Sequence, residues 1–201
     1  MPGGYREHPD VAAGSGAGDP ELIAFRYCDY DVPFWVRANS REGRWHVVGD
    51  PPTQYWSTTP DGAWAELIRA EELTLEDELD LLRMPIWVCR IPCLGLIDLR
   101  DSASQEQHGI TAADLTSEDW SACQRVATHV RASARGVISP SAAMDDASNV
   151  TLFGPRRAIA LEQRPALASA VPSAVVAHGR PRPGLIPSVL RRTGYPHPTL
   201  F

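Results

Sequence analysis

Two arginines occupy positions whose chemistry needs an explanation. Arg26 interrupts the apolar, strand-like run LIAFRY, and a cation buried in such a run requires an anionic partner. Simple strand alternation, which points Arg26 to solvent, is the default for this position. Arg44 lies beside Trp45 in a loop that Gly43 makes flexible. A guanidinium next to an indole suits a planar anionic ligand, through forked hydrogen bonds and stacking.

Two further polar residues belong to predicted helices. Glu66 lies about 130° from the centre of its helix's apolar stripe, at ~100° per residue, so plain solvation is its default. Ser121 follows Trp120 in the first turn of a later helix. A hydroxyl or backbone N–H at that positive end of the helix dipole can hold a phosphate, although most early-helix serines do not. Taken singly, none of these residues requires a function.

General catalytic and binding motifs are absent from the sequence, which has no GxGxxG, GxxxxGK, GxSxG or HExxH pattern. All 19 basic residues are Arg, which excludes a Lys Schiff base and a P-loop Lys. The six His residues include no close pair, so we expect no metal site. A net charge of -6 argues against a general nucleic-acid binder.

Most of the predicted elements are strands, and Arg26 lies in the first of them. Short runs rich in β-branched and aromatic residues, each bounded by turn residues, predict strands. These runs are LIAFRY, TQYWST, IWVCRI, LGLIDL, GVISP, NVTLF and AIALEQ.

Two helices are predicted between the strands. The first begins at Thr58 or Thr59, with Pro60 in the first-turn position that proline favours, and carries Glu66. The second begins at the capping-box pattern of residues 116–119. Strands, a helix and strands again, without regular βαβ alternation, predict a single mixed α+β domain.

The chain of 201 residues has room for one ordinary domain. Residues 1–20 contain eight Gly or Pro and predict a flexible leader. The domain is expected at 21–167, followed by a Pro/Gly/Arg-rich segment at 168–201 that follows the surface or is disordered, or else docks on a partner. Without a run of ~20 apolar residues or a secretion signal, we expect a cytoplasmic protein and no membrane partner.

The four cysteines fit neither a CxxC pair nor a usual zinc pattern. They stand at positions 28, 89, 93 and 123. We interpret them as buried small hydrophobic residues in a reducing compartment.

Six short words of the sequence, taken in order, resemble the RES-domain family, the toxin halves of bacterial toxin–antitoxin pairs. The resemblance covers roughly residues 22 to 160, and the Asp-Trp-Ser-Xaa-Cys-Gln word is similar to a mycobacterial branch that depletes NAD. The words are Phe25-Arg26-Tyr27, Glu42-Gly43-Arg44-Trp45, Gln54-Tyr55-Trp56-Ser57, Ala65-Glu66, Asp119-Trp120-Ser121-Ala122-Cys123-Gln124, and Gly136-Val137 through Asn149-Val150-Thr151-Leu152-Phe153.

This resemblance implies a fold similar to bacterial ADP-ribosyltransferase toxins and an enzyme that breaks the nicotinamide–ribose bond of NAD, as an NAD phosphorylase or NAD glycohydrolase. NAD is then the substrate rather than a cofactor, and inorganic phosphate or water is the acceptor. A small cognate antitoxin is implied as partner. By family similarity the catalytic residues are Glu66, Arg26 and Tyr55, and the substrate-binding residues are Tyr27, Arg44 and Ser121.

Two departures from the family pattern affect the expected site. Glu42 and His46 replace the Gly and the Asn that usually flank the Gly-Arg-Trp core of the loop. The family's Ser can be Ser121 or Ser141, and we prefer Ser121 because its surrounding word matches better. Two alternative functions stay open: a protein ADP-ribosyltransferase that uses the same pocket, and a catalytically dead module that only binds an antitoxin.

Overall fold

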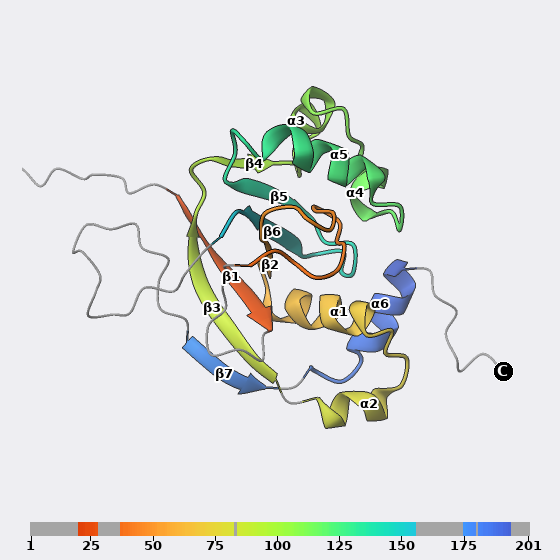
Figure 1. The fold of residues 1–201 in the computed structure, drawn as a ribbon. Helices are drawn as coiled ribbons and strands as arrows, with labels where there is room; N and C mark the ends of the chain where they lie inside the picture. Colours follow the sequence, from red (N-terminus) through yellow and green to blue (C-terminus); the bar gives the residue numbers. More distant parts are fainter. Residues whose placement is uncertain (1–19, 28–36, 83, 156–174, 180, 194–201) are drawn as a thin grey trace, which may run out of the picture.

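The centre of the molecule is a seven-stranded sheet with the order β4-β5-β6-β2-β1-β3-β7. The computed structural model describes residues 20–27, 37–82, 84–155, 175–179 and 181–193 (Figure 1). The strands are β1 Glu21–Tyr27, β2 Thr53–Ser57, β3 Met84–Pro92, β4 Leu96–Asp98, β5 Gly136–Pro140, β6 Ser148–Phe153 and β7 Val175–Gly179. All neighbouring strands are antiparallel except β4 and β5, which are parallel.

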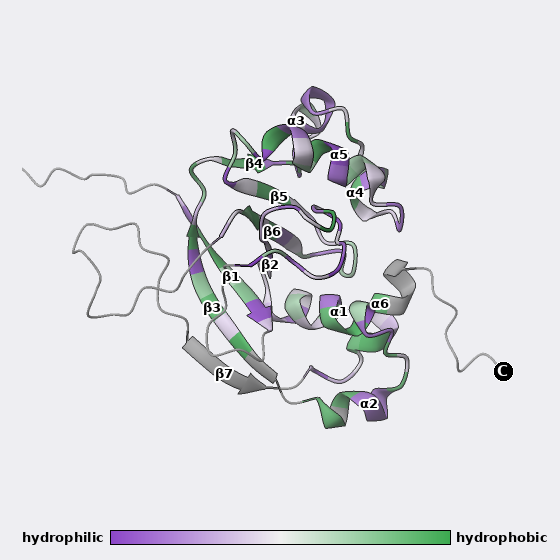
Figure 2. Cartoon of the chain, viewed as in Figure 1, coloured by the Kyte–Doolittle hydropathy of each residue, from purple (hydrophilic) through white to green (hydrophobic). Residues whose placement is uncertain are grey.

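Six of the seven predicted strands are confirmed, because each apolar run forms a strand at its expected place. The seventh run, AIALEQ, lies outside the described residues. In Figure 2, β1 is mostly hydrophobic and ends in a hydrophilic stretch, which corresponds to Arg26 in the sequence. Within β1 only Ala24 is buried, whereas Phe25, Arg26 and Tyr27 at its end are half-buried.

The sheet consists of two parts that meet at one point. β1 pairs with β3 over seven residue pairs, and β2 pairs with β6 over five. β1 and β2 are joined only by the pair Phe25 and Ser57. The two strands therefore diverge, and a cavity can form where they separate.

Helices form two groups against the sheet, one near β4 and β5 and one near β1 (Figure 1). The first group is α3 Ser102–Gln107, α4 Ala112–Thr116 and α5 Ser121–Val130, and the second is α1 Pro60–Ala70, α2 Glu76–Leu81 and α6 Leu185–Thr193. The start predicted for α1 is confirmed, because the Thr59 side chain accepts the Gly62 N–H and Pro60 occupies the first turn.

The start predicted for the second helix is wrong by several residues. Thr116 ends α4, and α5 begins at Ser121 after the N-cap residue Trp120, which makes no capping bond through its side chain. The polar residues of this stretch bond locally instead: Asp119 N–H donates to Ser117 Oγ, and Ser121 N–H donates to Asp119 Oδ1. Such side-chain bonds to nearby backbone compete with helix, so the sequence pattern falls in a connecting turn.

The C-terminal segment contributes more structure than its composition predicts. β7 pairs with β3, and α6 buries Leu185, Ile186 and Val189 in the core that it shares with α1. The surface or disordered interpretation of 168–201 is therefore wrong for these two elements. The apolar spacing is helical, but the Pro and Gly residues around it conceal the pattern, and a proline in a first helical turn is tolerated.

The fold class predicted from the sequence, a single mixed α+β domain, is confirmed. Two of the buried clusters lie with the helices, one at α1 and α6 and one at α4 and α5, and a third involves β1, β2, β3, β5 and β6. In the part of the chain that the structure describes, no helix is long and apolar enough to cross a bilayer.

Candidate active site

A cavity of about 500 Å³ lies where β1 and β2 diverge. Its walls come from the end of β1, the hairpin loop around Arg44, the end of β2 and one side of α1. Of the six residues expected at the site, the cavity brings together five: Arg26, Tyr27, Arg44, Tyr55 and Glu66.

Glu66 is held in place by two hydrogen bonds to one carboxylate oxygen. Its Oε1 accepts from Ser141 Oγ at 2.8 Å and from Asn149 Nδ2 at 2.6 Å. Ser141 is fully buried, and its Oγ accepts the N–H groups of Ala143 and Met144, so its hydroxyl hydrogen is directed to Glu66. The second oxygen, Oε2, has no hydrogen-bond partner among the described residues and remains available to a ligand in the cavity.

The position of Glu66 depends on a close approach of α1 to the sheet. A Cβ at Gly62 would overlap Ser57 Oγ and lie 2.9 Å from the Cβ of Ala147. Gly62 and Glu66 are one helical turn apart on the same side of α1. The missing side chain of Gly62 thus lets the helix come near enough for Glu66 to reach Asn149. The default interpretation of Glu66 as a solvated residue does not hold, because the sheet also covers this side of α1.

Arg44 stands at the tip of a tight hairpin with an unpaired charge. Gly43 and His46 exchange two backbone hydrogen bonds, of 3.1 and 3.2 Å, which leaves Arg44 and Trp45 as the two loop residues. Both terminal nitrogens of Arg44, Nη1 and Nη2, are buried and have no hydrogen-bond partner among the described residues. Burying a guanidinium without a partner costs free energy, and an anion bound in the cavity would offset that cost by accepting its hydrogen bonds.

The neighbour of Arg44 on the helix side is the thiol of Cys123. Burial raises the pKa of Cys123, and both the Arg44 charge and a weak contact between the Arg44 side chain and the thiol oppose this shift. A thiol carries no charge, so this contact leaves the Arg44 cation without an anionic partner among the described residues. The thiol lies 3.6 Å from the backbone oxygen of Asp114, to which it donates. Cys123 and Cys89 are buried, as the sequence analysis expects, whereas Cys93 is only half-buried and Cys28 lies outside the described residues.

Arg26 and Tyr27 occupy adjacent positions at the end of β1. The Arg26 guanidinium carbon lies 5.9 Å from the centre of the Trp56 ring, a cation–π distance. Tyr27 packs against the apolar core around α1 while it lines the cavity. Because successive residues of a strand point to opposite faces, these two side chains reach the cavity from the two sides of the strand end.

Tyr55 lies on β2 below the hairpin, and its hydroxyl is fully engaged. The hydroxyl oxygen is 3.0 Å from Trp45 N and 2.8 Å from His46 Nδ1. The other ring nitrogen of His46 is 2.8 Å from the backbone oxygen of Arg41. Burial raises the pKa of Tyr55 far above its ordinary value. His46, which departs from the family pattern, thus has a protein partner for each of its two ring nitrogens.

Ser121 does not belong to the cavity lining. Its side chain is exposed, and its N–H is taken by Asp119 Oδ1. The residue of this word that reaches the cavity is Trp120. Ser141, the alternative serine, touches Glu66 instead. The structure thus favours Ser141 over Ser121 as the serine of the site, against the preference drawn from the sequence words.

Asn149, Trp120 and Arg69 are among the lining residues that the sequence analysis did not name as site candidates. Arg69, at the end of α1, pairs with Glu118 at 2.6 Å and so connects α1 to the turn before α5 at the rim of the cavity. Trp120 Nε1 is buried without a partner among the described residues. The sequence did carry a signal for Asn149 and Trp120, because both occur in the words shared with the RES-domain family. Nothing in the sequence distinguishes Arg69 from the other arginines. In the described ranges, no three of His, Cys, Asp and Glu gather as metal ligands.

Comparison with known proteins shows the family and the fold of this chain. The family model of the RES domain matches residues 23–178. The probable NAD(+) phosphorylase Rv3189 of Mycobacterium tuberculosis is 30% identical over 138 residues, which make up 65% of this chain and 66% of that relative, just under two thirds of its length. The crystal structure of the M. tuberculosis MbcT–MbcA toxin–antitoxin complex shares the fold, with a TM-score of 0.60 and 22% identity over 79% of this chain and 85% of the matched one. The chain belongs to the RES domain family.

Proposed function

We propose that this protein cleaves the bond between nicotinamide and ribose in NAD, and that it acts as the NAD-depleting toxin of a toxin–antitoxin pair. The observation that carries the proposal is the pairing, in one cavity, of a carboxylate fixed through a single oxygen with a buried, unpaired guanidinium. The name of the M. tuberculosis relative, a probable NAD(+) phosphorylase, supports the choice of substrate.

Glu66 is the residue that would act at the reacting carbon. Departure of neutral nicotinamide leaves positive charge on the ribose C1 and the ring oxygen, and a nearby carboxylate stabilises that charge. Because Ser141 and Asn149 hold Oε1, the free Oε2 points to one fixed place. Such preorganisation avoids reorienting the carboxylate during the reaction. In this proposal Ser141 and Asn149 are positioning residues for Glu66.

The arginines would bind the diphosphate of NAD. Arg44 brings two unpartnered terminal nitrogens, which suit forked contacts to phosphate oxygens. Arg26, at the end of β1, brings a second positive charge to the same cavity. Tyr27 would offer its ring to the nicotinamide or the ribose. Trp120 replaces Ser121 in this proposal, because it is the residue of that word that lines the cavity and carries an unpaired indole N–H.

The acceptor that we favour is inorganic phosphate. In phosphorolysis a phosphate oxygen forms a bond to ribose C1 while the C1–nitrogen bond to nicotinamide breaks, and the electron pair leaves with nicotinamide, which becomes neutral. The attacking oxygen gives up one negative charge of the phosphate to the new bond, which balances the positive charge lost by the nicotinamide ring. The phosphate is anionic before and after this step and needs a cationic site, which Arg26 or Arg44 could supply alongside the diphosphate. Phosphorolysis is also what the name of the relative states.

The toxin assignment implies a cytoplasmic protein with a cognate antitoxin. The matched solved structure is itself a toxin–antitoxin complex. An antitoxin that closes the cavity would meet several arginines, so its contact segment is expected to carry an acidic side chain or a C-terminal carboxylate.

The test is NAD consumption by the purified full chain, with and without inorganic phosphate, beside Glu66→Gln. We expect nicotinamide release that depends on phosphate, a phosphorylated ADP-ribose product, and loss of turnover in the variant. Release without phosphate would identify hydrolysis instead. Radiolabel from NAD on protein would identify an ADP-ribosyltransferase. No loss of NAD by wild-type protein with native circular dichroism would overturn the proposal.

Expression of the chain without its antitoxin provides the cellular arm of the test. We expect growth arrest and a fall in cellular NAD with wild type, and normal growth with Glu66→Gln at the same protein level. Arrest by both proteins would show that toxicity does not come from NAD cleavage.

A further inference from the structure

We propose that Tyr55 and His46 form a hydrogen-bonded support that positions the Arg44 hairpin, so that Tyr55 acts through Arg44 rather than on the reacting atoms. The inference rests on the proposed function only in naming the anion that Arg44 meets. It replaces the catalytic role that the family resemblance implied for Tyr55.

The direction of each hydrogen bond in this support follows from its partners. A backbone N–H can only donate, so Tyr55 Oη accepts from Trp45 N at 3.0 Å. A carbonyl can only accept, so His46 Nε2 carries a hydrogen and donates to the Arg41 oxygen at 2.8 Å. In the neutral ring His46 Nδ1 is then an acceptor, and the Tyr55 hydroxyl donates to it at 2.8 Å. The single hydroxyl proton of Tyr55 is thereby committed to His46.

The hydroxyl is also covered by the hairpin itself. A Cβ at Gly43 would lie 2.7 Å from Tyr55 Oη and 2.5 Å from His46 Cε1. The backbone of Gly43 therefore lies directly against the hydroxyl and leaves no room for a substrate atom to approach from that side. Tyr55 lines the cavity, and its hydroxyl is already engaged by Trp45 and His46.

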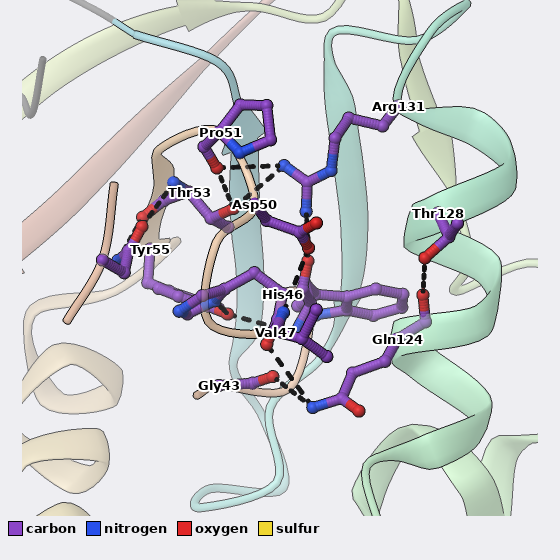
Figure 3. A network of polar contacts seen from close by, with 12 residues as sticks. Gly43, His46, Val47, Asp50, Pro51, Thr53, Tyr55, Gln124, Thr128 and Arg131 are labelled. Carbon is purple, nitrogen blue, oxygen red and sulfur yellow. Dashed lines mark hydrogen bonds and ion pairs between the residues drawn. The ribbon is translucent and has the colours of Figure 1, made fainter. Parts of the chain in front are cut away.

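Helix α5 holds the hairpin from the other side (Figure 3). Gln124 Nε2 donates to the backbone oxygens of Gly43 and His46, at 3.1 and 3.4 Å. Arg131 donates to the Trp45 oxygen at 2.7 Å and pairs with Asp50 at 3.3 Å. The carbonyls of the hairpin are thus bound by α5, whereas the Trp45 N–H is bound by Tyr55. Between these two supports, the backbone that carries Arg44 has little freedom to move.

Protonation of His46 would break this arrangement. With a hydrogen on Nδ1, the ring would donate to Tyr55 Oη, which already accepts from Trp45, and the hydroxyl proton would lose its acceptor. The charged groups around His46 are Arg131, the C-cap residue that follows α5, and Asp50 and Glu42 from its own loop, and the titratable Tyr55 faces it from β2. Burial, aided by Arg131, lowers the pKa of His46. The neutral form that the support requires is therefore the favoured one.

Two substitutions of His46 test its two hydrogen bonds one at a time, because each variant keeps one bond and loses the other. An Asn amide reaches about as far as Nδ1, so His46→Asn keeps an acceptor for Tyr55 and gives up the Arg41 contact. A Gln amide reaches about as far as Nε2, so His46→Gln keeps the Arg41 contact and removes the acceptor at Nδ1.

The experiment measures hydrogen exchange of the hairpin and steady-state kinetics for Tyr55→Phe, His46→Asn, His46→Gln and the double variant Tyr55→Phe/His46→Gln. The exchange arm needs no substrate, so it decides the inference even if the protein does not consume NAD. We expect exchange of residues 43–46 to speed up about tenfold in Tyr55→Phe and His46→Gln but much less in His46→Asn. The double variant is expected to be no worse than either single variant, because one support is lost in all three.

Kinetics supply the second readout. We expect Tyr55→Phe and His46→Gln to raise KM for NAD about tenfold with kcat changed less than about threefold, since the anion contact weakens while Glu66 is untouched. The inference would be overturned if Tyr55→Phe lowered kcat about a hundredfold while hydrogen exchange of the hairpin and the kinetics of His46→Gln stayed as in wild type. That result would mean that Tyr55 acts directly on the reacting atoms. Unchanged hairpin exchange in both single variants would overturn it by itself.

Discussion

The Ser141 hydroxyl donates to the Glu66 carboxylate at 2.8 Å, across 75 residues of sequence. Two backbone N–H groups, from Ala143 and Met144, occupy the acceptor side of the same hydroxyl. The loop after β5 thus fixes a serine, and the serine fixes a carboxylate on α1. Ser121, which the sequence words favoured, has no such relationship with Glu66.

A pair of serine variants tests this relationship. Ser141→Ala is expected to lower kcat for NAD cleavage about tenfold or more, because a hydrogen bond to a charged group contributes roughly 1.5–3 kcal/mol. Ser121→Ala is the matched control and is expected to keep wild-type turnover, since that side chain is exposed and outside the cavity. Steady-state kinetics, with melting temperatures to account for the lost backbone contacts, provide the comparison. Equal effects of the two substitutions would contradict the geometry.

The approach of α1 to the sheet gives a second prediction. In Gly62→Ala the new Cβ would overlap Ser57 Oγ, so α1 must shift and carry Glu66 away from Asn149. We expect a destabilisation of about 1–3 kcal/mol, as for other overpacked sites, together with a fall in kcat. Chemical denaturation and NAD turnover measure the two effects.

A compensating substitution shows whether the overlap is the cause. Gly62→Ala/Ser57→Ala removes the closest atom that the new Cβ meets. The double variant is therefore expected to regain part of the stability lost by the single one. Strictly additive losses would show that the helix position does not depend on this contact.

Much of the fold was predictable because its signals are local. The apolar runs predict β1 to β6, and Thr59 with Pro60 predicts the start of α1. The short helices α2, α3 and α4 carry too little periodicity to be predicted from it. Local caps begin two of them, the Asp101 side chain at α3 and the capping box of Thr111 and Asp114 at α4. The helix start predicted from the capping-box pattern at 116–119 is wrong for a physical reason. The side chains of Ser117 and Asp119 accept backbone N–H groups two residues further on, in a turn.

The site was predictable in part. Glu66 and Arg44 lie in the cavity as the sequence words implied, whereas Ser121 lies outside its lining, because words measure similarity and not distance. Ser141 reaches Glu66 only through the pairing of β5 with β6, a contact that no local pattern encodes. The unpaired state of Arg44 likewise depends on how α5 packs over the hairpin.

The thiols provide a prediction that is independent of NAD. Cys89 and Cys123 are buried, and burial raises the pKa of Cys89 to about 12 and also raises that of Cys123. We expect both to resist iodoacetamide near pH 8 in the folded protein and to react fully in guanidinium chloride, because the thiolate is the nucleophile. Site-resolved mass spectrometry measures the labelled fraction at each position. Rapid labelling of Cys123 in the native state would show that the core cluster around this thiol opens to solvent.

The buried ring of His46 predicts how stability depends on pH. Its pKa in the folded protein lies below the ordinary value of 6.5, mainly because burial disfavours the charged form. The unfolded chain therefore binds more protons than the folded chain between these two pKa values, and the free energy of unfolding rises with pH across that window. The contribution of His46 is complete above the unfolded pKa of about 6.5 and is lost as the pH falls toward the folded pKa.

Urea denaturation at about pH 7.5 and about pH 5 measures this contribution as the drop in unfolding free energy between the two conditions. We expect a smaller drop in His46→Asn than in wild type, because Asn does not titrate and still accepts from Tyr55. His129→Asn is the matched control: its ring lies on the exposed side of α5, outside the hairpin network, and the drop should stay as in wild type. An equal drop in wild type and His46→Asn would mean that the folded protein accommodates the protonated ring, and that the Tyr55 hydroxyl has another acceptor when His46 is charged.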